Sequence, residues 1–190
     1  MGRAKLLLPL SRKPLIAHAI EAWERSSVER IVIVIRPDDK ALADALNAIC
    51  DVDVVIPDVP PPDMKASIQA ALKHIEARFN PSPSDGFLVA PADMPRLSAT
   101  IIDRLIQRHL AAPGENVFVP TINGRRGHPT LFSWRLAAEI HRLAADEGLN
   151  SIVDRQQPEL VVCEDLIAGD EYPFADIDTP EQYRQLAGDD

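Results

Sequence analysis

The chain has 190 residues, of which 46% are hydrophobic and 26% charged, and its formal net charge is −9. This length and composition are typical of a globular protein, so we expect one domain over residues 1–190. The acidic balance disfavours a nucleic-acid surface, which needs a basic stripe, and no apolar run reaches the roughly 20 residues that cross a bilayer.

Strand-like and helix-like stretches alternate along the sequence. Helical spacing of apolar residues predicts helices over residues 14–25, 38–49, 64–79, 99–110, 134–145 and 179–186. Short apolar runs rich in β-branched residues predict strands over residues 30–35, 52–56, 87–90, 116–121 and 160–163. This alternation indicates an α/β fold with a doubly wound, Rossmann-like and mostly parallel sheet.

The cysteines and the N-terminal segment bear on the cellular compartment. Cys50 and Cys163 lie far apart without metal-ligand spacing, which favours buried thiols in a reducing environment over a disulfide or a zinc site. The apolar run at residues 6–10 is too short and too interrupted for the core of a signal peptide. We therefore expect a cytoplasmic protein that contacts neither nucleic acid nor membrane.

Asp93 stands where an apolar run ends, and Pro95 closes that run two residues later. Ligands of an open parallel sheet bind outside the carboxyl ends of its strands. A strand over residues 87–90 would therefore present the Asp93 carboxylate at the binding edge, where a hard cation prefers oxygen ligands. In the alternative interpretation, Asp93 only caps the following helix.

Three further polar clusters fall in connections between predicted elements. Near the N-terminus, Lys5 offers a positive charge for a phosphate and Gly2 permits close backbone approach, although a terminal lysine is more often simply solvated. Residues 123–129 bracket two arginines and a histidine with glycines, which suits either an anionic ligand or an exposed hairpin. A helix cap needs only one of the two carboxylates of Asp176 and Asp178, so the presence of a second one suggests a metal site.

These clusters belong to four motifs that span the chain from Met1 almost to its end. The motifs are Met1-Gly2-x-x-Lys5-Leu-Leu-Leu-Pro-Leu10, Ala92-Asp93-Met94-Pro95, Gly124-Arg-Arg-Gly127-His128-Pro129 and Asp176-Ile-Asp178-Thr-Pro180-Glu181. In this order they resemble the molybdenum-cofactor nucleotidyltransferases, members of the MobA-like NTP transferases. The resemblance implies a nucleotide-diphospho-sugar transferase-like fold. It also implies Mg²⁺-dependent transfer of CMP or GMP from a nucleoside triphosphate to molybdopterin or a related phosphorylated acceptor. The third motif is more similar to the cytidylyltransferase branch.

The resemblance also implies roles for individual residues. Lys5 and Asp93 would be catalytic, with Lys5 at the triphosphate and leaving pyrophosphate, and with Asp93 and Asp178 as the magnesium ligands. The nucleotide-binding residues would be Lys5, Met64 and Ser67, in a chain where Lys65 and Ala71 replace the family's usual Ser and Gly. The acceptor-binding residues would be Arg125, Arg126, Gly127, His128 and Pro129.

The family's sequences begin with a strand and a Gly-rich loop, Leu-Ala-Ala-Gly-x-Ser-x-Arg, just before the Met-Gly that is residue 1 here. That loop gives backbone N–H groups to phosphates, and its strand lies in mid-sheet. For the 190 residues of this sequence we expect a first strand to be missing. Strands 31–35 and 87–90 then either pair directly or leave a gap that residues 6–10 partly fill, with self-association through open edges.

Two alternatives to this enzyme stay open. A non-catalytic binding module of the same fold would keep the site but would not hold a triphosphate. A sugar-phosphate nucleotidyltransferase would share the metal-binding carboxylates but is not expected to carry the Gly-His-Pro loop.

Overall fold

Helices and strands alternate along the computed structural model, which describes residues 3–49, 52–112, 115–167, 173–177 and 179–187. Helices α1 to α7 span Leu15–Glu24, Lys40–Leu46, Met64–Phe79, Ala99–Ala111, Ala137–His141, Leu149–Arg155 and Pro180–Ala187. Strands β1 to β9 span Pro9–Leu10, Lys13–Pro14, Ile31–Val34, Val52–Val55, Gly86–Val89, Val117–Ile122, Arg125–Arg126, Thr130–Ser133 and Glu159–Val162. Short 3-10 helices cover Arg3–Leu7 (η1), Trp134–Leu136 (η2) and Glu164–Leu166 (η3).

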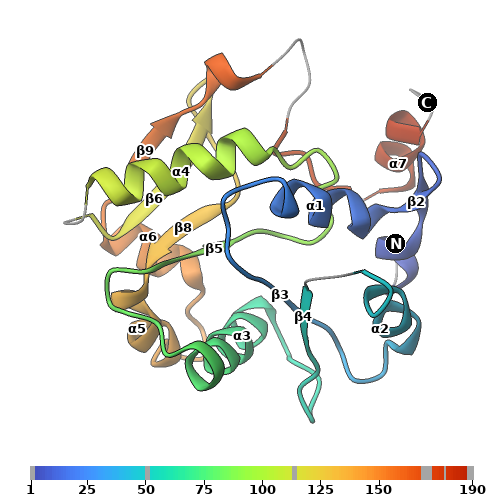
Figure 1. Ribbon diagram of the computed structural model, residues 1–190, viewed down its shortest axis with the longest axis horizontal. Helices are drawn as coiled ribbons and strands as arrows, with labels where there is room; N and C mark the ends of the chain where they lie inside the picture. The colour runs from blue at the N-terminus through green and yellow to red at the C-terminus, as the bar shows by residue number, and fades with distance from the viewer. Residues whose placement is uncertain (1–2, 50–51, 113–114, 168–172, 178, 188–190) are drawn as a thin grey trace.

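The larger sheet has the strand order β5-β8-β6, with β9 along the other edge of β6 and the short β7 at its end. Strand β8 is antiparallel to both β5 and β6, so β5 and β6 run in the same direction, and β9 is parallel to β6. Strands β3 and β4 form a separate parallel pair (Figure 1). The long strands are therefore mostly parallel with β8 reversed, which confirms the predicted fold class.

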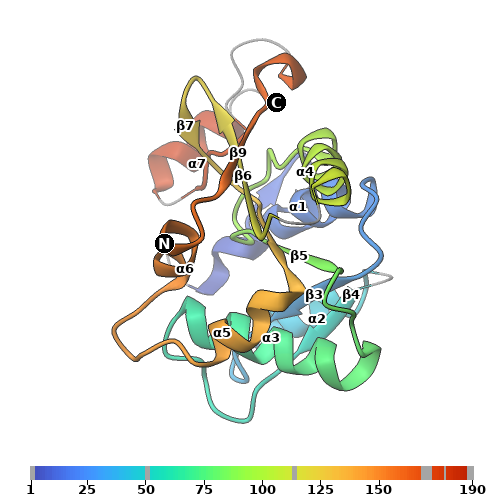
Figure 2. The ribbon, with the colours of Figure 1, turned by 90° about the vertical axis from the view of Figure 1, so that its left-hand side faces the viewer.

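Helices cover both faces of the larger sheet, and Figure 2 places α4 and α6 on opposite sides of β6. Neighbouring residues of a strand point to opposite faces. Phe132 of β8 accordingly packs in the core beneath α3, α5 and α6, whereas Leu131 packs in the core beneath α4. Among the residues described, no helix is long and apolar enough to cross a membrane.

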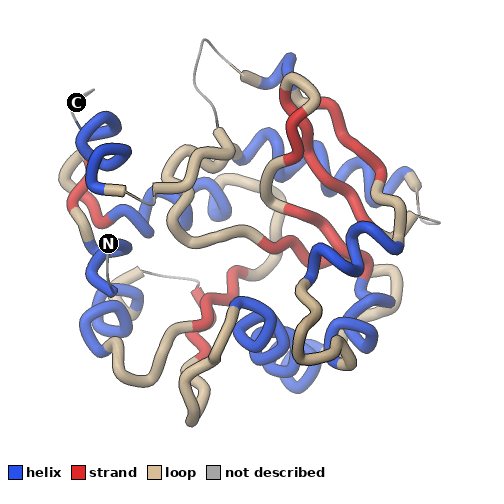
Figure 3. The backbone as a smooth tube through the Cα atoms, turned by 180° about the vertical axis from the view of Figure 1, so that it is seen from behind, coloured by secondary structure: helices blue, strands red, loops and turns tan. Residues whose placement is uncertain are grey.

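Strands β3 and β5 do not pair with each other within the described residues (Figure 3). Direct pairing, one of the two expected arrangements, is therefore not the one adopted. Instead, Leu6 and Leu7 of η1 pack in one cluster with Ile31 and Ile33 of β3 and with Ala92, which follows β5. The N-terminal segment thus fills part of the space, and all four residues of β3 stay half-buried.

The helix predicted over residues 134–145 is shorter than its sequence pattern suggests. It consists of η2 and α5 and ends at His141. The backbone carbonyls of Ala144 and Ala145 accept hydrogen bonds from the Lys65 ammonium, at 2.6 and 2.9 Å, outside any helix. A tertiary contact therefore overrides the local helical pattern there. Strand β8 and helix α6 were not predicted.

Candidate active site

Asp93 lies in the turn between β5 and α4 and forms an ion pair with Lys5, which is 88 residues away in sequence. The Lys5 Nζ atom donates to Asp93 Oδ2 at 2.6 Å, and the two side chains are only 14% and 21% exposed. Helix α4 begins at Ala99 with Ser98 in its N-cap position, so Asp93 does not cap that helix. The carboxylate instead faces the Lys5 ammonium, beyond the carboxyl end of β5.

The second oxygen of Asp93 has a different environment. Asp93 Oδ1 is buried and has no hydrogen-bond partner among the described residues. A buried carboxylate oxygen without a partner is costly, unless a ligand satisfies it. Hard divalent cations prefer such oxygens, so Asp93 fits the metal-binding role that the sequence motifs imply.

His128 is a further titratable group at this site, beside Lys5 and Asp93. Burial lowers the pKa of His128, while a hydrogen bond to the Val89 backbone and the negative charges of Asp176 and Asp93 oppose that shift. Its Nδ1 atom is buried without a hydrogen-bond partner among the described residues. At neutral pH the ring is therefore uncharged, because its pKa lies below the ordinary value of about 6.5.

The segment 175–177 lies against the Asp93 turn. The Ile177 backbone N–H donates to the Asp93 carbonyl oxygen at 3.3 Å, and the Ile177 side chain is buried. Asp176, one of the two carboxylates whose pairing suggests a metal, thereby lies close enough to His128 for its charge to act on that ring, as Asp93 also does. Asp178, the second predicted magnesium ligand, lies outside the described residues. Across the described ranges, no group of three His, Cys, Asp or Glu side chains forms a metal site.

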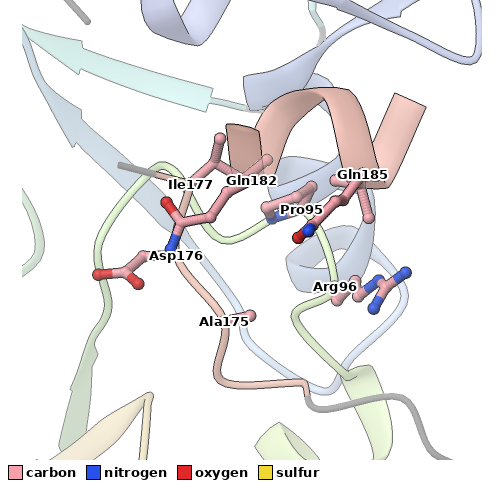
Figure 4. A pocket seen from close by; sticks show the side chains of 8 residues that line it. Pro95, Arg96, Ala175, Asp176, Ile177, Gln182 and Gln185 are labelled. Carbon is pink, nitrogen blue, oxygen red and sulfur yellow. The ribbon is translucent and has the colours of Figure 1, made fainter. Parts of the chain in front are cut away.

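A groove of about 290 Å³ opens beside this segment, between the Asp93 turn and α7 (Figure 4). Its lining residues are Pro95, Arg96, Ala175, Asp176, Ile177, Gln182, Gln185 and Leu186. Asp176 and Arg96 lie at opposite ends of the groove. Thr179 caps α7, because its Oγ1 accepts from the Gln182 N–H while Gln182 Oε1 accepts from the Thr179 N–H.

The five predicted acceptor residues are not all brought together. Arg125 and Arg126 form the exposed strand β7, and Arg126 pairs with Asp154 at 3.2 Å. Gly127 is buried against the ring of Phe174, and Pro129 is buried as well. His128 is the member of this set that the structure places beside Asp93.

The two further nucleotide-binding candidates stand on the first turn of α3. Met64 is 62% exposed, and the Ser67 hydroxyl donates to the Asp63 carbonyl oxygen at 3.2 Å. Between them, the Lys65 ammonium donates to the carbonyls of Ala144, Ala145 and Glu147 at 2.6, 2.9 and 2.8 Å. Lys65 therefore ties the start of α3 to the turn after α5.

Residues 1–160 match the family model of the MobA-like NTP transferase domain. The chain belongs to this family. The match confirms the resemblance inferred from the four sequence motifs and identifies the chain as a member of an enzyme family of nucleotidyltransferases.

The chain is also similar to individual proteins. The bifunctional protein GlmU of Kineococcus radiotolerans is 32% identical over 117 residues, which are 62% of this chain but only 23% of that protein. The structure of Rv0371c from Mycobacterium tuberculosis in complex with manganese has a TM-score of 0.74 and 23% identity, over 98% of this chain and 93% of that one. The molybdopterin-guanine dinucleotide biosynthesis protein A of Archaeoglobus fulgidus has a TM-score of 0.69 and 20% identity, over 98% and 90%. At these identities the solved structures establish the shared fold.

Proposed function

We propose that the protein is a magnesium-dependent nucleotidyltransferase that moves CMP or GMP from CTP or GTP to a phosphorylated acceptor of the molybdopterin type. The observation that carries this proposal is the Lys5–Asp93 pair at the carboxyl end of β5, together with the unpartnered Asp93 Oδ1. A positive charge stands there beside a carboxylate oxygen that would hold a metal ion, and phosphoryl transfer needs both.

The reaction requires charge neutralisation and positioning more than proton transfer. An oxygen of the acceptor phosphate would form a bond to the α-phosphorus while the bond from that phosphorus to the bridging oxygen breaks and pyrophosphate leaves. Lys5 would neutralise charge on the leaving pyrophosphate. The acceptor phosphate is already ionised, so no protein general base is required. Asp93 and Asp178 would hold the Mg²⁺ ion, which supplies electrostatic stabilisation when bound.

The acceptor would occupy the side of the site formed by His128 and the groove. The groove continues from Asp176, which lies near His128, toward the guanidinium of Arg96. Its amide side chains, Gln182 and Gln185, suit a hydrogen-bonding body such as a pterin, and Arg96 suits an anionic group. The exposed Arg125 and Arg126 would contribute to this side only through the outer hairpin.

The proposal includes one domain over residues 1–190 and a cytoplasmic location. Cys163 is a buried free thiol, as is usual for proteins of a reducing compartment. No nucleic acid or membrane partner is part of the proposal.

An assay of pyrophosphate release tests the proposal directly. The protein is incubated with Mg²⁺, with CTP or GTP, and with molybdopterin or a hexose 1-phosphate as acceptor. We expect release with molybdopterin, and we expect Asp93→Asn to reduce the rate by at least about a hundredfold, as for other groups that stabilise a transition state electrostatically. The Asn side chain keeps the size of Asp93, so the fold should persist, which circular dichroism checks.

Asp44→Asn is the matched control, because Asp44 is an exposed carboxylate paired with Lys40 on α2. It should leave the rate unchanged. Release with hexose 1-phosphate alone would favour the sugar-phosphate alternative. No release with either acceptor would contradict the proposed activity and favour a non-catalytic binding module.

A further inference from the structure

The Lys5–Asp93 ion pair joins two groups that the reaction would use for different ligands. Lys5 would contact the triphosphate and Asp93 would bind the metal, yet here the ammonium lies 2.6 Å from the carboxylate. Both side chains are largely shielded from water, where a charge-assisted hydrogen bond is stronger than at the surface. The Lys5 ammonium therefore occupies the position that the metal would take at Asp93, and the Asp93 carboxylate occupies the position that the triphosphate would take at Lys5.

Asp93 binds this ammonium through only one of its oxygens. Oδ2 accepts from Lys5, whereas Oδ1 is buried without a hydrogen-bond partner in the described parts of the chain. A divalent cation at Oδ1 would place two positive charges beside the Lys5 ammonium on a single carboxylate. Like charges this close repel strongly in a partly buried site. A metal ion and the ammonium therefore compete for Asp93.

The Lys5 backbone would not need to move for the ammonium to leave. It belongs to η1, where the neighbouring Leu6 and Leu7 are packed into the cluster with β3 and α2. The lysine side chain has four flexible carbon bonds, so rotation of the stem alone redirects the charge. The fixed turn and flexible stem make Lys5 suited to an exchange between two partners.

We propose that Lys5 is the resident counter-ion of Asp93, that a divalent cation displaces it, and that the displaced ammonium then binds the triphosphate. This inference rests on the proposed function and adds how the two ligands of that site are coupled. Metal alone binds weakly because it must displace Lys5. A triphosphate draws Lys5 away from Asp93, so metal and nucleotide strengthen each other's binding, as linkage requires.

Lysine acetylation footprinting of the full chain tests the displacement. The protein is treated with N-hydroxysuccinimide acetate with and without saturating Mg²⁺, and labelling of each lysine is followed by mass spectrometry. We expect Mg²⁺ to raise the labelling rate of Lys5 about tenfold. Lys65, held by three backbone carbonyls, and Lys13, exposed and paired with Glu21, should be labelled at the same rates under both conditions. Asp93→Asn should raise labelling of Lys5 without metal and abolish its response to Mg²⁺.

Mn²⁺ titration followed by electron paramagnetic resonance tests the competition without nucleotide or activity. Lys5→Met keeps most of the stem but removes the charge, and we expect it to bind Mn²⁺ about tenfold more tightly than the unaltered chain, within the usual range of coupling between sites. In the presence of Mg²⁺ the same variant should bind CTP about tenfold more weakly. Lys13→Met is the matched control and should change neither affinity.

The results separate this inference from the proposed function. Mn²⁺ that binds without changing Lys5 labelling, or that binds Lys5→Met no more tightly, overturns the exchange while leaving transferase activity possible. Increased Lys5 labelling with Mg²⁺, in a protein that releases no pyrophosphate, supports the exchange and overturns the proposed activity. Absence of Mn²⁺ binding to both the unaltered chain and Lys5→Met contradicts the exchange.

Discussion

Gly127 lies directly against the ring of Phe174, because a Cβ atom on this glycine would be only 2.0 Å from Phe174 Cδ2. Phe174 is buried in the core beneath α4, and it leads into the segment whose Ile177 N–H donates to the Asp93 carbonyl. Gly127→Ala must therefore shift the ring and the segment beside Asp93. We expect it to lower the free energy of unfolding by about 1–3 kcal/mol, the usual cost of overpacking, in urea titrations.

Gly148→Ala is the control for this substitution. A Cβ on Gly148 meets nothing within 4 Å, so this variant should lose less stability than Gly127→Ala. The double variant Gly127→Ala, Phe174→Leu should recover part of the loss if the clash with the ring is its cause. Equal stability of the two alanine variants would contradict the packing argument.

The sequence contained enough information to locate Asp93 but not its partner. An apolar run ending in a carboxylate places that side chain at the binding edge of a sheet, and this position needs no tertiary knowledge. The bond from Lys5 joins residues 88 positions apart, and no local pattern specifies such a contact. The same limit applies to His128, whose burial and nearness to Asp176 arise only when separate connections meet.

Among the elements, long helices with a regular apolar stripe were the most predictable. Helix α3 covers the predicted residues 64–79, and α1 differs from its prediction by one residue at each end. Strand β8 was missed because its four residues lie directly between Pro129 and Trp134, the start of the predicted helix, and the segment before them has the glycines and charges of a loop. The helix predicted to reach residue 145 ends early, and the backbone carbonyls of Ala144 and Ala145 accept hydrogen bonds from Lys65 instead. Local helix propensity does not include such a contact.

The hydrogen bonds from Lys65 to the turn after α5 should contribute measurably to stability. Its ammonium uses all three N–H donors on the carbonyls of Ala144, Ala145 and Glu147. We expect Lys65→Met to cost about 1.5–3 kcal/mol in urea denaturation, the value of a hydrogen bond to a charged group, because the turn can reach water after the loss. Hydrogen exchange should also become faster in residues 142–147.

Lys73→Met is the matched control, since Lys73 is an exposed lysine on the same helix. It should change stability by less than about 0.5 kcal/mol, as is usual for surface positions. If Lys65→Met and Lys73→Met behave alike, the three carbonyl contacts do not stabilise the turn.

At the scale of the whole molecule, the division of the strands into separate sheets matters most for stability and association. Strand β3 pairs only with β4 and β5 only with β8 within the described residues, so each has one edge without a partner strand. The β-branched residues of β3 are half-buried, although such a run is typical of a strand buried on both faces. Strand edges that lack a partner strand favour pairing with another chain.

We expect the amide groups of β3 and β5 to exchange hydrogen faster than those of β6, which has partners on both edges.

Each unpaired group that is buried costs about 1–3 kcal/mol, against a typical total stability of roughly 5–15 kcal/mol. The unpartnered edges of β3 and β5 should therefore lower the stability of the protein and make it self-associate in sedimentation velocity as its concentration rises. A chain that stays monomeric and protects β3 and β5 as well as β6 would show that these edges are closed in another way.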